Sequence, residues 1–412
     1  MSTSTRPPST LLPLDEALAL LLGALGPVTA RETLATFDAL GRVLAADVRS
    51  TLDVPPADNT AMDGYALRAA DVPEAGTVLP VSQRIPAGVV GAVLVPGTAA
   101  RIFTGAQIPI GADTVVMQEQ ATALDGAVRI DTVPQRGQWV RRRGEDVQSG
   151  AVVLSAGLRL TAPALGMAAS VGASSLEVTK RPRVALFSTG DELAMPGEVL
   201  KPGAIYNSNR YTLRGLVQAL GCPCEDLGIV PDSLEATRAA LRRAATGNDV
   251  IVTCGGVSVG EEDHLKPAVK AEGRLDLWSI ALKPGKPLAF GEVRREDGSN
   301  AWFLGLPGNP VSATVTFLLT VRPFLLRLQG ATDVQTRPVA MRADFDWPTP
   351  DRRREFMRAR RNAGGGLDLY PNQSSGVLTS MVWGEGLVDN PAGHAIKRGD
   401  TVAFLPFSEL LA

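Results

Sequence analysis

The sequence contains little histidine and little cysteine for its length. Its 412 residues include two histidines and three cysteines. A histidine-centred nucleophilic mechanism has only His264 and His394 available, which argues against that class of enzyme. The cysteines, Cys222, Cys224 and Cys254, do not have the spacing of zinc ligands, so we expect reduced, partly buried thiols. Catalysis would therefore depend on other side chains.

The chain also lacks a charge imbalance and a long apolar run. Its formal net charge is −2 and its pI is near 5.9, which gives no electrostatic footprint for nucleic acid or an anionic membrane. No segment approaches the ~20 uninterrupted apolar residues of a membrane span. The apolar N-terminal segment carries Asp15 and Glu16 and has no signal-peptide cleavage pattern. We therefore expect a cytoplasmic protein that contacts neither nucleic acid nor a membrane.

Two common nucleotide-binding motifs are missing as well. Neither a Walker A loop nor a GxGxxG fingerprint occurs, so a P-loop or dinucleotide-binding fold lacks its main support. With 45% hydrophobic and 20% charged residues, a chain of this length can bury several cores, and two to four domains are expected.

The pattern of apolar residues changes several times along the chain. Helical spacing after Leu14 returns between Val153 and Val178, with short alternating runs between Pro and Gly in the part between them. After Arg183, β and α elements alternate, which predicts a doubly wound, mostly parallel sheet. We therefore predict a multidomain α/β protein with four domains: a helical linker domain (11–48 and 148–178), an inserted β-rich domain (49–147), the α/β domain (179–329) and a C-terminal β-barrel or sandwich (330–412).

Four loops of the predicted α/β domain carry most of the candidate ligands. Each follows a predicted strand, and the carboxyl ends of parallel strands lie at one edge of a sheet. Glycines expose backbone N–H groups that attract an oxyanion, whereas the carboxylates would repel it unless a divalent cation lay between them. We therefore expect a metal-bridged phosphate or similar oxyanion at this edge. The loops are Ser188–Glu192, Asp232–Ser233, Gly255–Asp263 and Gly305–Pro310.

Structural explanations also exist for these loops. Asp232 with Glu235 forms a capping-box pattern at the start of a helix, and this role is as well supported as a ligand role. Ser208 or Asn209 could cap the preceding helix. The prolines of GLPGNP could serve only to begin the next helix, which is compatible with ligand contact. The carboxylate of Glu192, after STG at a strand end, favours a functional role.

Cations and further polar loops complete the candidate residues. Lys283 and Lys286 flank a turn that prolines restrain, which favours an oxyanion partner. Polar clusters at Asn59–Ala66, Arg101–Ala106 and Arg143–Asp146 lie in the predicted β-rich domain. Those loops are remote in sequence from the α/β edge.

Eight short motifs occur in one order along nearly the whole chain: NTAMDGYA, RIFTGA with GADTVVMQE, RRRGEDV, STGDEL, YNSN, GGVSVGEEDH, KPGKP and GLPGNPVSA. In this order they resemble the molybdopterin molybdenumtransferase family, which contains bacterial MoeA and the E domain of gephyrin. The resemblance implies that adenylylated molybdopterin and molybdate are the substrates. Molybdenum would be inserted into the dithiolene, AMP would leave, and Mg²⁺ would be required.

The resemblance also assigns roles to individual residues of this chain. The implied metal ligands are Glu192, Asp232 and Asp263. The implied catalytic residues are Asp63, Thr104, Asp146, Glu192, Asp232 and Asp263. The implied substrate-binding residues are Ser188, Thr189, Gly190, Gly255, Gly256, Ser258, Gly260, Lys283, Lys286, Pro307 and Pro310.

The match is weaker toward the C-terminus. Arg353, Arg354 and Ser380 are the only matches to the family's C-terminal site residues, and their place in the site is left open. A family lysine just upstream of the KPGKP loop has no counterpart near Ser279. One anion contact of the family is therefore absent from that position.

An assembly is implied too. The linker domain would separate Asp63 and Asp146 from the acids of the α/β domain, so we expect a homodimer whose site is shared between subunits. An upstream molybdopterin adenylyltransferase is a further expected partner. Two alternatives remain: the protein could itself be such an adenylyltransferase, whose single-domain fold resembles the α/β part, or a non-catalytic molybdopterin-binding scaffold. The additional β domains argue against the first, and the retained acidic motifs argue against the second.

Overall fold

The computed structural model of the chain describes residues 11–256 and 264–411. These residues form two compact units. Unit 1 comprises residues 11–32, 41–43 and 179–411, and unit 2 comprises residues 33–40 and 44–178. The predicted linker domain (11–48 and 148–178) crosses this division, because residues 11–32 belong to unit 1. The predicted boundaries inside each unit stay a prediction.

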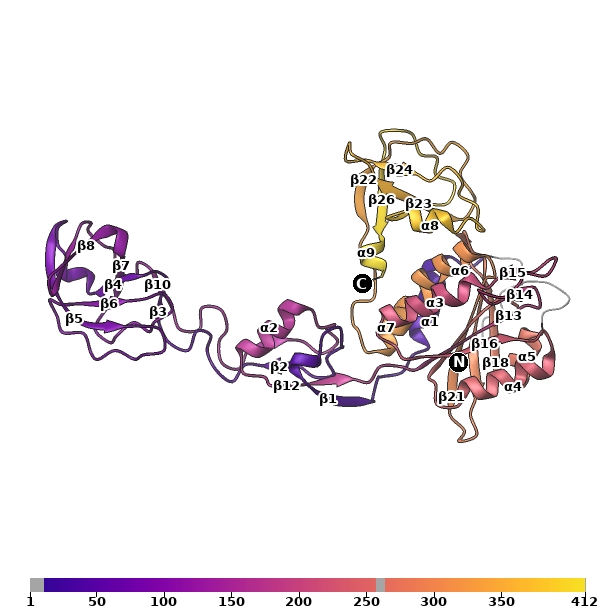
Figure 1. Cartoon of the computed structure of the whole chain (residues 1–412), viewed down its shortest axis with the longest axis horizontal. Helices are drawn as coiled ribbons and strands as arrows, with labels where there is room; N and C mark the ends of the chain where they lie inside the picture. The colour runs from indigo at the N-terminus through magenta and orange to yellow at the C-terminus, as the bar shows by residue number, and fades with distance from the viewer. Residues whose placement is uncertain (1–10, 257–263, 412) are drawn as a thin grey trace. The chain divides into compact units, whose positions relative to one another are not determined.

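A six-stranded sheet forms the core of unit 1, in the order β16-β13-β17-β21-β20-β18 (Figure 1). The first four strands in this order are parallel, whereas β20 and β18 run antiparallel to their neighbours. The predicted mostly parallel sheet is thereby confirmed. The strands are β13 (Val184–Thr189), β16 (Cys224–Val230), β17 (Val250–Cys254), β18 (Gly273–Ser279), β20 (Pro287–Arg294) and β21 (Asn300–Leu306).

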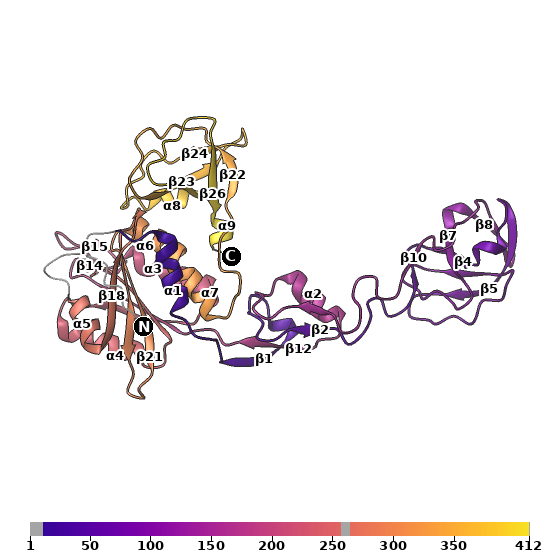
Figure 2. The same ribbon diagram turned by 180° about the vertical axis from the view of Figure 1, so that it is seen from behind.

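Helices cover both faces of this sheet, as Figures 1 and 2 show from opposite sides. Along β13, the buried Val184 and Leu186 belong to one hydrophobic core, and the buried Ala185 and Phe187 belong to the other. Burial on both faces explains why these strands are continuous apolar runs. The first face packs α1 (Leu14–Gly23), α3 (Ser208–Ala219), α6 (Pro310–Thr316), the π-helical η4 (Phe317–Val321) and α7 (Arg322–Leu328), and the second packs α4 (Leu234–Ala245) and α5 (Leu265–Glu272).

One helix in the described part of the chain, Pro310–Leu328, is long and apolar enough to cross a membrane, and 89% of its apolar window is buried within the structure. This segment is the run α6–η4–α7, which packs into the core beside the sheet. Its composition is therefore explained by packing inside unit 1.

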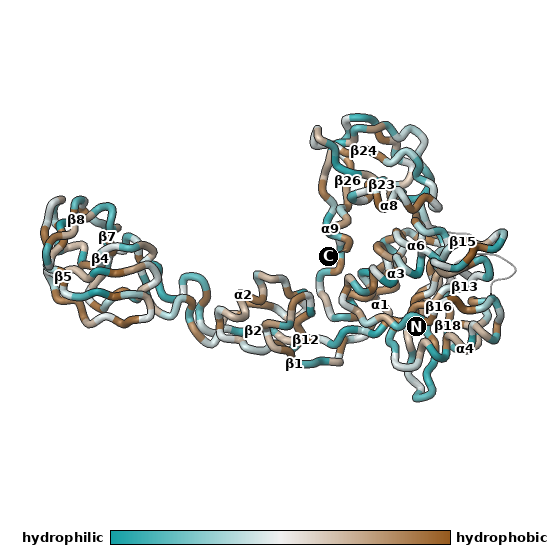
Figure 3. The backbone as a smooth tube through the Cα atoms, in the orientation of Figure 1, coloured by the Kyte–Doolittle hydropathy of each residue, from teal (hydrophilic) through white to brown (hydrophobic). Residues whose placement is uncertain are grey.

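The hydrophilic turn between β20 and β21, teal in Figure 3, lies at the amino-terminal end of β21. It therefore lies at the edge of the sheet opposite the carboxyl ends of the parallel strands.

The helical prediction for the first 48 residues was correct for α1 and wrong for residues 31–47. The structure has β1 (Arg31–Ala35), a single 3₁₀ turn η1 (Thr36–Asp38) and β2 (Val48–Arg49). Phe37 and Leu40, which completed the apparent helical stripe, are 93% and 58% exposed. Their spacing therefore did not mark a buried face, and pairing of β1 with β12 supplies the backbone partners instead.

The location of α1 also differs from the prediction, which placed it in the linker domain. Its buried Leu14, Ala17 and Leu21 belong to the core of the α/β sheet. The helix contacts α7. A hydrophobic helix packs on whichever apolar face the fold leaves open, and sequence spacing does not specify that face.

Unit 2 is rich in β structure, which confirms the β-rich prediction for its central part. Its main sheet has the order β7-β4-β6-β5-β9-β8. The second predicted helical segment contains one short helix between two strands. The elements are β3 (Asn59–Thr60), β4 (Gly64–Leu67), η2 (Ala69–Asp71), β5 (Thr77–Ile85), β6 (Ala99–Ile102), β7 (Thr114–Met117), η3 (Gln118–Gln120), β8 (Ala121–Leu124), β9 (Ala127–Ile130), β10 (Val140–Arg141), β11 (Val152–Leu154), α2 (Ala162–Ser170) and β12 (Ser175–Thr179).

A second six-stranded sheet in unit 1 contains the C-terminal strands and confirms the predicted C-terminal β structure. Its order is β19-β23-β25-β26-β22, and β24 pairs with β23. Strand β19 comes from the KPGKP segment and runs parallel to β23, with Lys283 opposite Glu355. The remaining elements are β14 (Leu193–Ala194), β15 (Ile205–Tyr206), β19 (Leu282–Lys283), β22 (Val339–Arg342), β23 (Arg354–Arg361), β24 (Leu367–Leu369), α8 (Thr379–Trp383), β25 (Gly386–Asn390), β26 (Thr401–Pro406) and α9 (Phe407–Leu410).

Candidate active site

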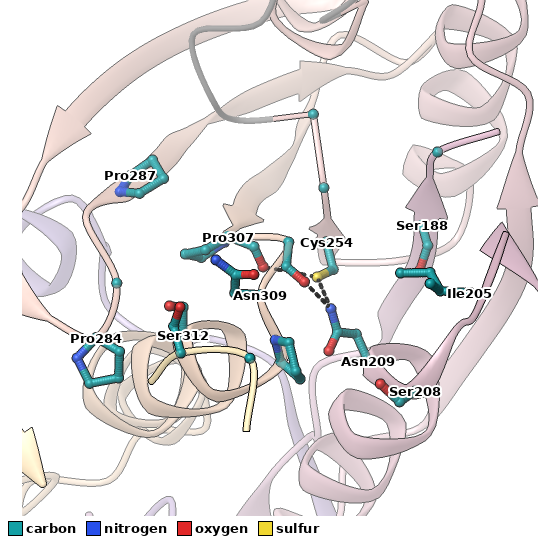
Figure 4. A pocket seen from close by; sticks show the side chains of 18 of the residues that line it. Ser188, Ile205, Ser208, Asn209, Cys254, Pro284, Pro287, Pro307, Asn309 and Ser312 are labelled. Atoms are coloured by element: carbon teal, nitrogen blue, oxygen red, sulfur yellow. Dashed lines mark hydrogen bonds between the residues drawn. The ribbon is translucent and has the colours of Figure 1, made fainter. Parts of the chain in front are cut away.

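A cavity of about 1040 Å³ lies at the carboxyl ends of the parallel strands (Figure 4). The described parts of all four predicted loops line it, as open α/β sheets arrange their ligand sites. The expectation that these loops gather at one edge is confirmed. Predicted loop residues in the lining are Ser188, Thr189, Gly190, Glu192, Asp232, Gly255, Gly256, Pro307 and Pro310.

Close approach of backbones holds the strand-end loops together. Gly255 has a φ of 97°, and a Cβ atom there would lie 2.7 Å from the backbone oxygen of Thr189. Its N–H donates to the carbonyl of Leu306 at 3.2 Å. Only glycine fits this position, because a side chain would meet both strain and a backbone clash.

Two carboxylate residues lie on the β13 and β16 side of the cavity. The Glu192 side chain folds back over its own loop, as its distance from Gly190 shows. A Cβ atom added to Gly190 would lie 2.6 Å from Glu192 Oε2. The N–H of Asp232 donates to Asp191 Oδ1 at 3.2 Å, which joins the two loops. Carboxylates at neighbouring strand ends could hold a hard divalent cation.

The capping predictions were wrong by one or two residues. Ser233, and not Asp232, caps α4 by accepting a hydrogen bond from Ala236 N at 3.2 Å. Asn207, and not Ser208 or Asn209, caps α3. Several neighbouring polar residues at a helix start can serve as the cap, and the backbone conformation there determines which one does. The Asp232 side chain is therefore not needed for capping.

The opposite wall of the cavity carries three cations, which come from β19, from the turn after it and from the residue before β23. Lys283 Nζ lies 3.1 Å from Glu355 Oε1 and 3.4 Å from Asp351 Oδ2. Arg353 binds Asp351 through two nitrogens, at 2.9 and 3.0 Å, and holds the pKa of that carboxyl well below its usual range. Lys286 is exposed and pairs with no carboxylate within the described ranges. Its charge is the least neutralised of the three.

Of the other C-terminal matches, neither lines this cavity. Arg354 pairs with Asp389 at 2.6 Å and with Asp15 at 3.0 Å. Ser380 is fully buried and accepts a hydrogen bond from Arg358 Nε at 3.0 Å. Both residues therefore have structural partners away from the cavity.

Unit 2 brings two of the predicted catalytic residues together. Thr104 donates to Asp63 Oδ1 through both its N–H and its hydroxyl, each at 2.7 Å. These hydrogen bonds, with a smaller contribution from the charge of Arg101, lower the pKa of Asp63. Asp146 is exposed, and its N–H donates to the carbonyl of Val54 at 3.0 Å.

The whole chain resembles known proteins. Three family models match it: the MoeA N-terminal region (domain I and II) at 12–172, the probable molybdopterin binding domain at 185–327 and the MoeA C-terminal region (domain IV) at 340–407. A Haemophilus influenzae protein named molybdopterin molybdenumtransferase is 37% identical over 409 residues, covering 97% of this chain and 100% of that protein. The chain belongs to the molybdopterin molybdenumtransferase family.

Comparisons with two further proteins support this assignment. A Nostoc protein of the same name is 41% identical over 296 residues, covering 70% of this chain and 67% of that protein. The crystal structure of the molybdopterin biosynthesis moeA protein from Pyrococcus horikoshii superposes with a TM-score of 0.83 and 29% identity. The superposition covers 96% of this chain and 100% of that structure. The fold is therefore that of the family along its full length.

Part of the site expected for this family lies outside the described residues, namely Ser258, Gly260 and Asp263. Within residues 11–256 and 264–411, no group of three or more His, Cys, Asp or Glu side chains is arranged to hold a metal ion. Of the predicted metal ligands, Glu192 and Asp232 line the same cavity. The roles assigned to these residues stay predictions.

Several residues that line the cavity were not predicted from the sequence. Asn209 was interpreted only as a helix cap, yet its side chain contacts two loops of the cavity. Cys254 was expected only to be a reduced, partly buried thiol. It is buried and free, but it also lines the cavity. Its place as the last residue of a central parallel strand was the available signal. Further lining residues are Ser208, Ser312, Gln373, Ser374, Ser375 and Gly376.

Proposed function

We propose that this protein inserts molybdate into adenylylated molybdopterin, with release of AMP, during biosynthesis of the molybdenum cofactor. The supporting observation is the cavity at the strand ends of a chain that belongs to this family. That cavity has carboxylates on one wall and the cations of Lys283, Lys286 and Arg353 on the other. The volume of about 1040 Å³ is at the upper end of the range of small-molecule sites, as a substrate with a pterin and a nucleotide requires.

The charges of the cavity explain how two anions could be held together. Unit charges of one sign repel by roughly 4 kcal/mol at ~4 Å for an effective dielectric constant of 20. Lys286 would offset this repulsion most effectively, because no described carboxylate pairs with it. Lys283 and Arg353 are held in place by Asp351 and Glu355, so they present charge from fixed positions.

Mg²⁺ is the metal that the donor chemistry favours. Glu192 and Asp232 offer only hard carboxylate oxygens to the cavity, and such ligands suit Mg²⁺ rather than zinc. Asp263 would be the third ligand. When bound, the cation would neutralise phosphate charge beside the carboxylates. Activity should require Mg²⁺ and survive chelation that removes only zinc.

The direct test is molybdate-dependent release of AMP from adenylylated molybdopterin. Glu192→Ala should nearly abolish it, whereas Glu235→Ala, an exposed glutamate of α4 outside the cavity, should not. Both variants should retain the wild-type circular dichroism spectrum. Absence of AMP release by the wild-type protein would reject the proposed function and favour a non-catalytic scaffold.

The alternative of a molybdopterin adenylyltransferase is disfavoured by the extent of the family match. The matched regions include the MoeA N-terminal and C-terminal regions on either side of the molybdopterin binding domain. We expect an adenylyltransferase to act upstream as a partner, since the substrate arrives adenylylated. A cytoplasmic location is part of the same proposal.

A homodimer with shared sites is also proposed. Asp63 and Thr104 form one cluster in unit 2, and Glu192 and Asp232 lie in unit 1. If a site needs acids from two subunits, mixing inactive Asp63→Ala with inactive Glu192→Ala under exchange conditions should restore activity. About a quarter of wild-type activity is expected, because half of random dimers are mixed and each has one intact site. Mixed dimers without activity would show that the acids act within one chain.

A further inference from the structure

The first turn of α3 makes an unusual set of contacts in the cavity. Asn209 Nδ2 donates to the carbonyl of Gly308 at 2.7 Å and to Cys254 Sγ at 2.9 Å. Cys254 Sγ in turn donates to the carbonyl of Pro307 at 3.0 Å. Figure 4 shows Asn209 between the end of β17 and the loop after β21. One side chain therefore links the start of α3, the end of β17 and the loop after β21.

The chemistry of the partners fixes the orientation of the Asn209 amide. A carbonyl can only accept, so the NH₂ group must face Gly308. Both amide hydrogens are then in use, and the Cys254 sulfur accepts one of them. Burial raises the pKa of Cys254 to about 12, so the thiol keeps the proton that it donates to Pro307. The three hydrogen bonds are mutually consistent in direction.

The segments that Asn209 links lie side by side at the ends of the neighbouring strands β17 and β21. A Cβ atom added to Gly308 would come within 4.0 Å of the Cα of Gly255. The Gly255 N–H bonds Leu306 in the same region. Asn209 Oδ1 points away from Cys254 (Figure 4) and accepts no hydrogen bond from the residues that the structure describes. The nitrogen side of the amide thus carries the link.

We propose that Asn209 is a positioning residue, which holds the Pro307–Asn309 loop against Cys254 at the end of β17 so that this wall of the cavity is formed before the substrate binds. The role rests on the proposed function, because the ligand is taken to be adenylylated molybdopterin. A preformed wall avoids the cost of ordering two loops during binding. Its loss should weaken ground-state and transition-state binding alike, and so raise KM more than it lowers kcat.

The test compares two substitutions at this position. Asn209→Asp keeps the size and the oxygen but cannot donate, and Asn209→Ala removes both groups. Each should raise the KM for adenylylated molybdopterin roughly tenfold, as expected for the loss of about one net hydrogen bond, with kcat within about threefold. Gln218→Ala, at an exposed position of the same helix, is the control and should be unchanged. Binding of the substrate without molybdate, measured by calorimetry, should weaken in parallel.

Substitutions at the sulfur provide a second arm. Cys254→Ser keeps a donor and an acceptor and should stay within about threefold of the wild-type KM, whereas Cys254→Ala should raise it. Combining Asn209→Ala with Cys254→Ala should cost less than the sum of the two, since they share one link. A wild-type KM in folded Asn209→Asp would overturn the proposal, as would full additivity. Because wild-type AMP release is measured alongside, failure of the proposed function would be recognised separately.

Discussion

The buried carboxylate of Glu355 is the structural centre of the cationic wall, and replacing it by glutamine should destabilise the protein strongly. The Glu355 side chain is 2% exposed and accepts from Lys283 Nζ at 3.1 Å through Oε1. Its Oε2 accepts from Trp347 Nε1 at 2.9 Å, from Asp351 N at 3.1 Å and from Asn390 Nδ2 at 3.3 Å. Four donors therefore converge on one carboxylate.

Glutamine cannot satisfy both sides of this arrangement. If its oxygen faces the three donors on the Trp347 side, its NH₂ group faces the ammonium of Lys283, and the hydrogen bond there is lost. A hydrogen bond to a charged group contributes about 1.5–3 kcal/mol. The other three would weaken from charged to neutral, by roughly 0.5–1 kcal/mol each. The free energy of unfolding should fall by about 3–6 kcal/mol, close to the loss of about 3–5 kcal/mol that is typical when a buried ion pair is broken.

Urea unfolding followed by tryptophan fluorescence measures this change, because Trp347 contacts the mutated group directly. Glu385→Gln is the matched control. Glu385 binds Arg361 at 2.7 Å, but both side chains are more than 40% exposed. The control should cost about 1 kcal/mol or less. Equal, small losses in both variants would refute the view that Glu355 is needed as a buried carboxylate.

Three further outcomes are expected. Lys286→Ala should raise the substrate KM at least about fivefold, since a unit charge ~4 Å away contributes ~1 kcal/mol even in water. Lys397 is exposed and lies outside the cavity, so Lys397→Ala should leave the KM unchanged. An equal rise in KM for both variants would contradict the role assigned to Lys286. Burial raises the pKa of Cys254 to about 12. Its thiol should therefore react with iodoacetamide at pH 8 about a thousandfold more slowly in the folded than in the unfolded protein. Peptide mapping of the alkylated protein measures this rate. Gly255→Ala should destabilise the fold by more than Gly298→Ala. Both glycines have a positive φ, but only at Gly255 would the new Cβ atom meet a backbone atom, at 2.7 Å. Similar urea midpoints for the two variants would disprove this.

The sequence alone determined the α/β part of the fold and most of the candidate site. Buried parallel strands are apolar on both faces, so β13 and β17 were visible as continuous runs. Because parallel strands end at one edge, the loops containing Glu192, Asp232 and Gly255 could be placed together without a structure. Order and spacing of motifs then indicated the family.

Other features depended on contacts between segments far apart in the chain, which local pattern does not encode. Residues 31–47 have helical spacing, yet β1 pairs with β12, more than a hundred residues later. The pairing of β19 with β23 places Lys283 beside Glu355 and so decides which lysine is neutralised. The contacts of Asn209 with two strand-end loops arise in the same way. Side-chain type and period fix what an element can bury, whereas its partners are chosen by the packing of the whole chain.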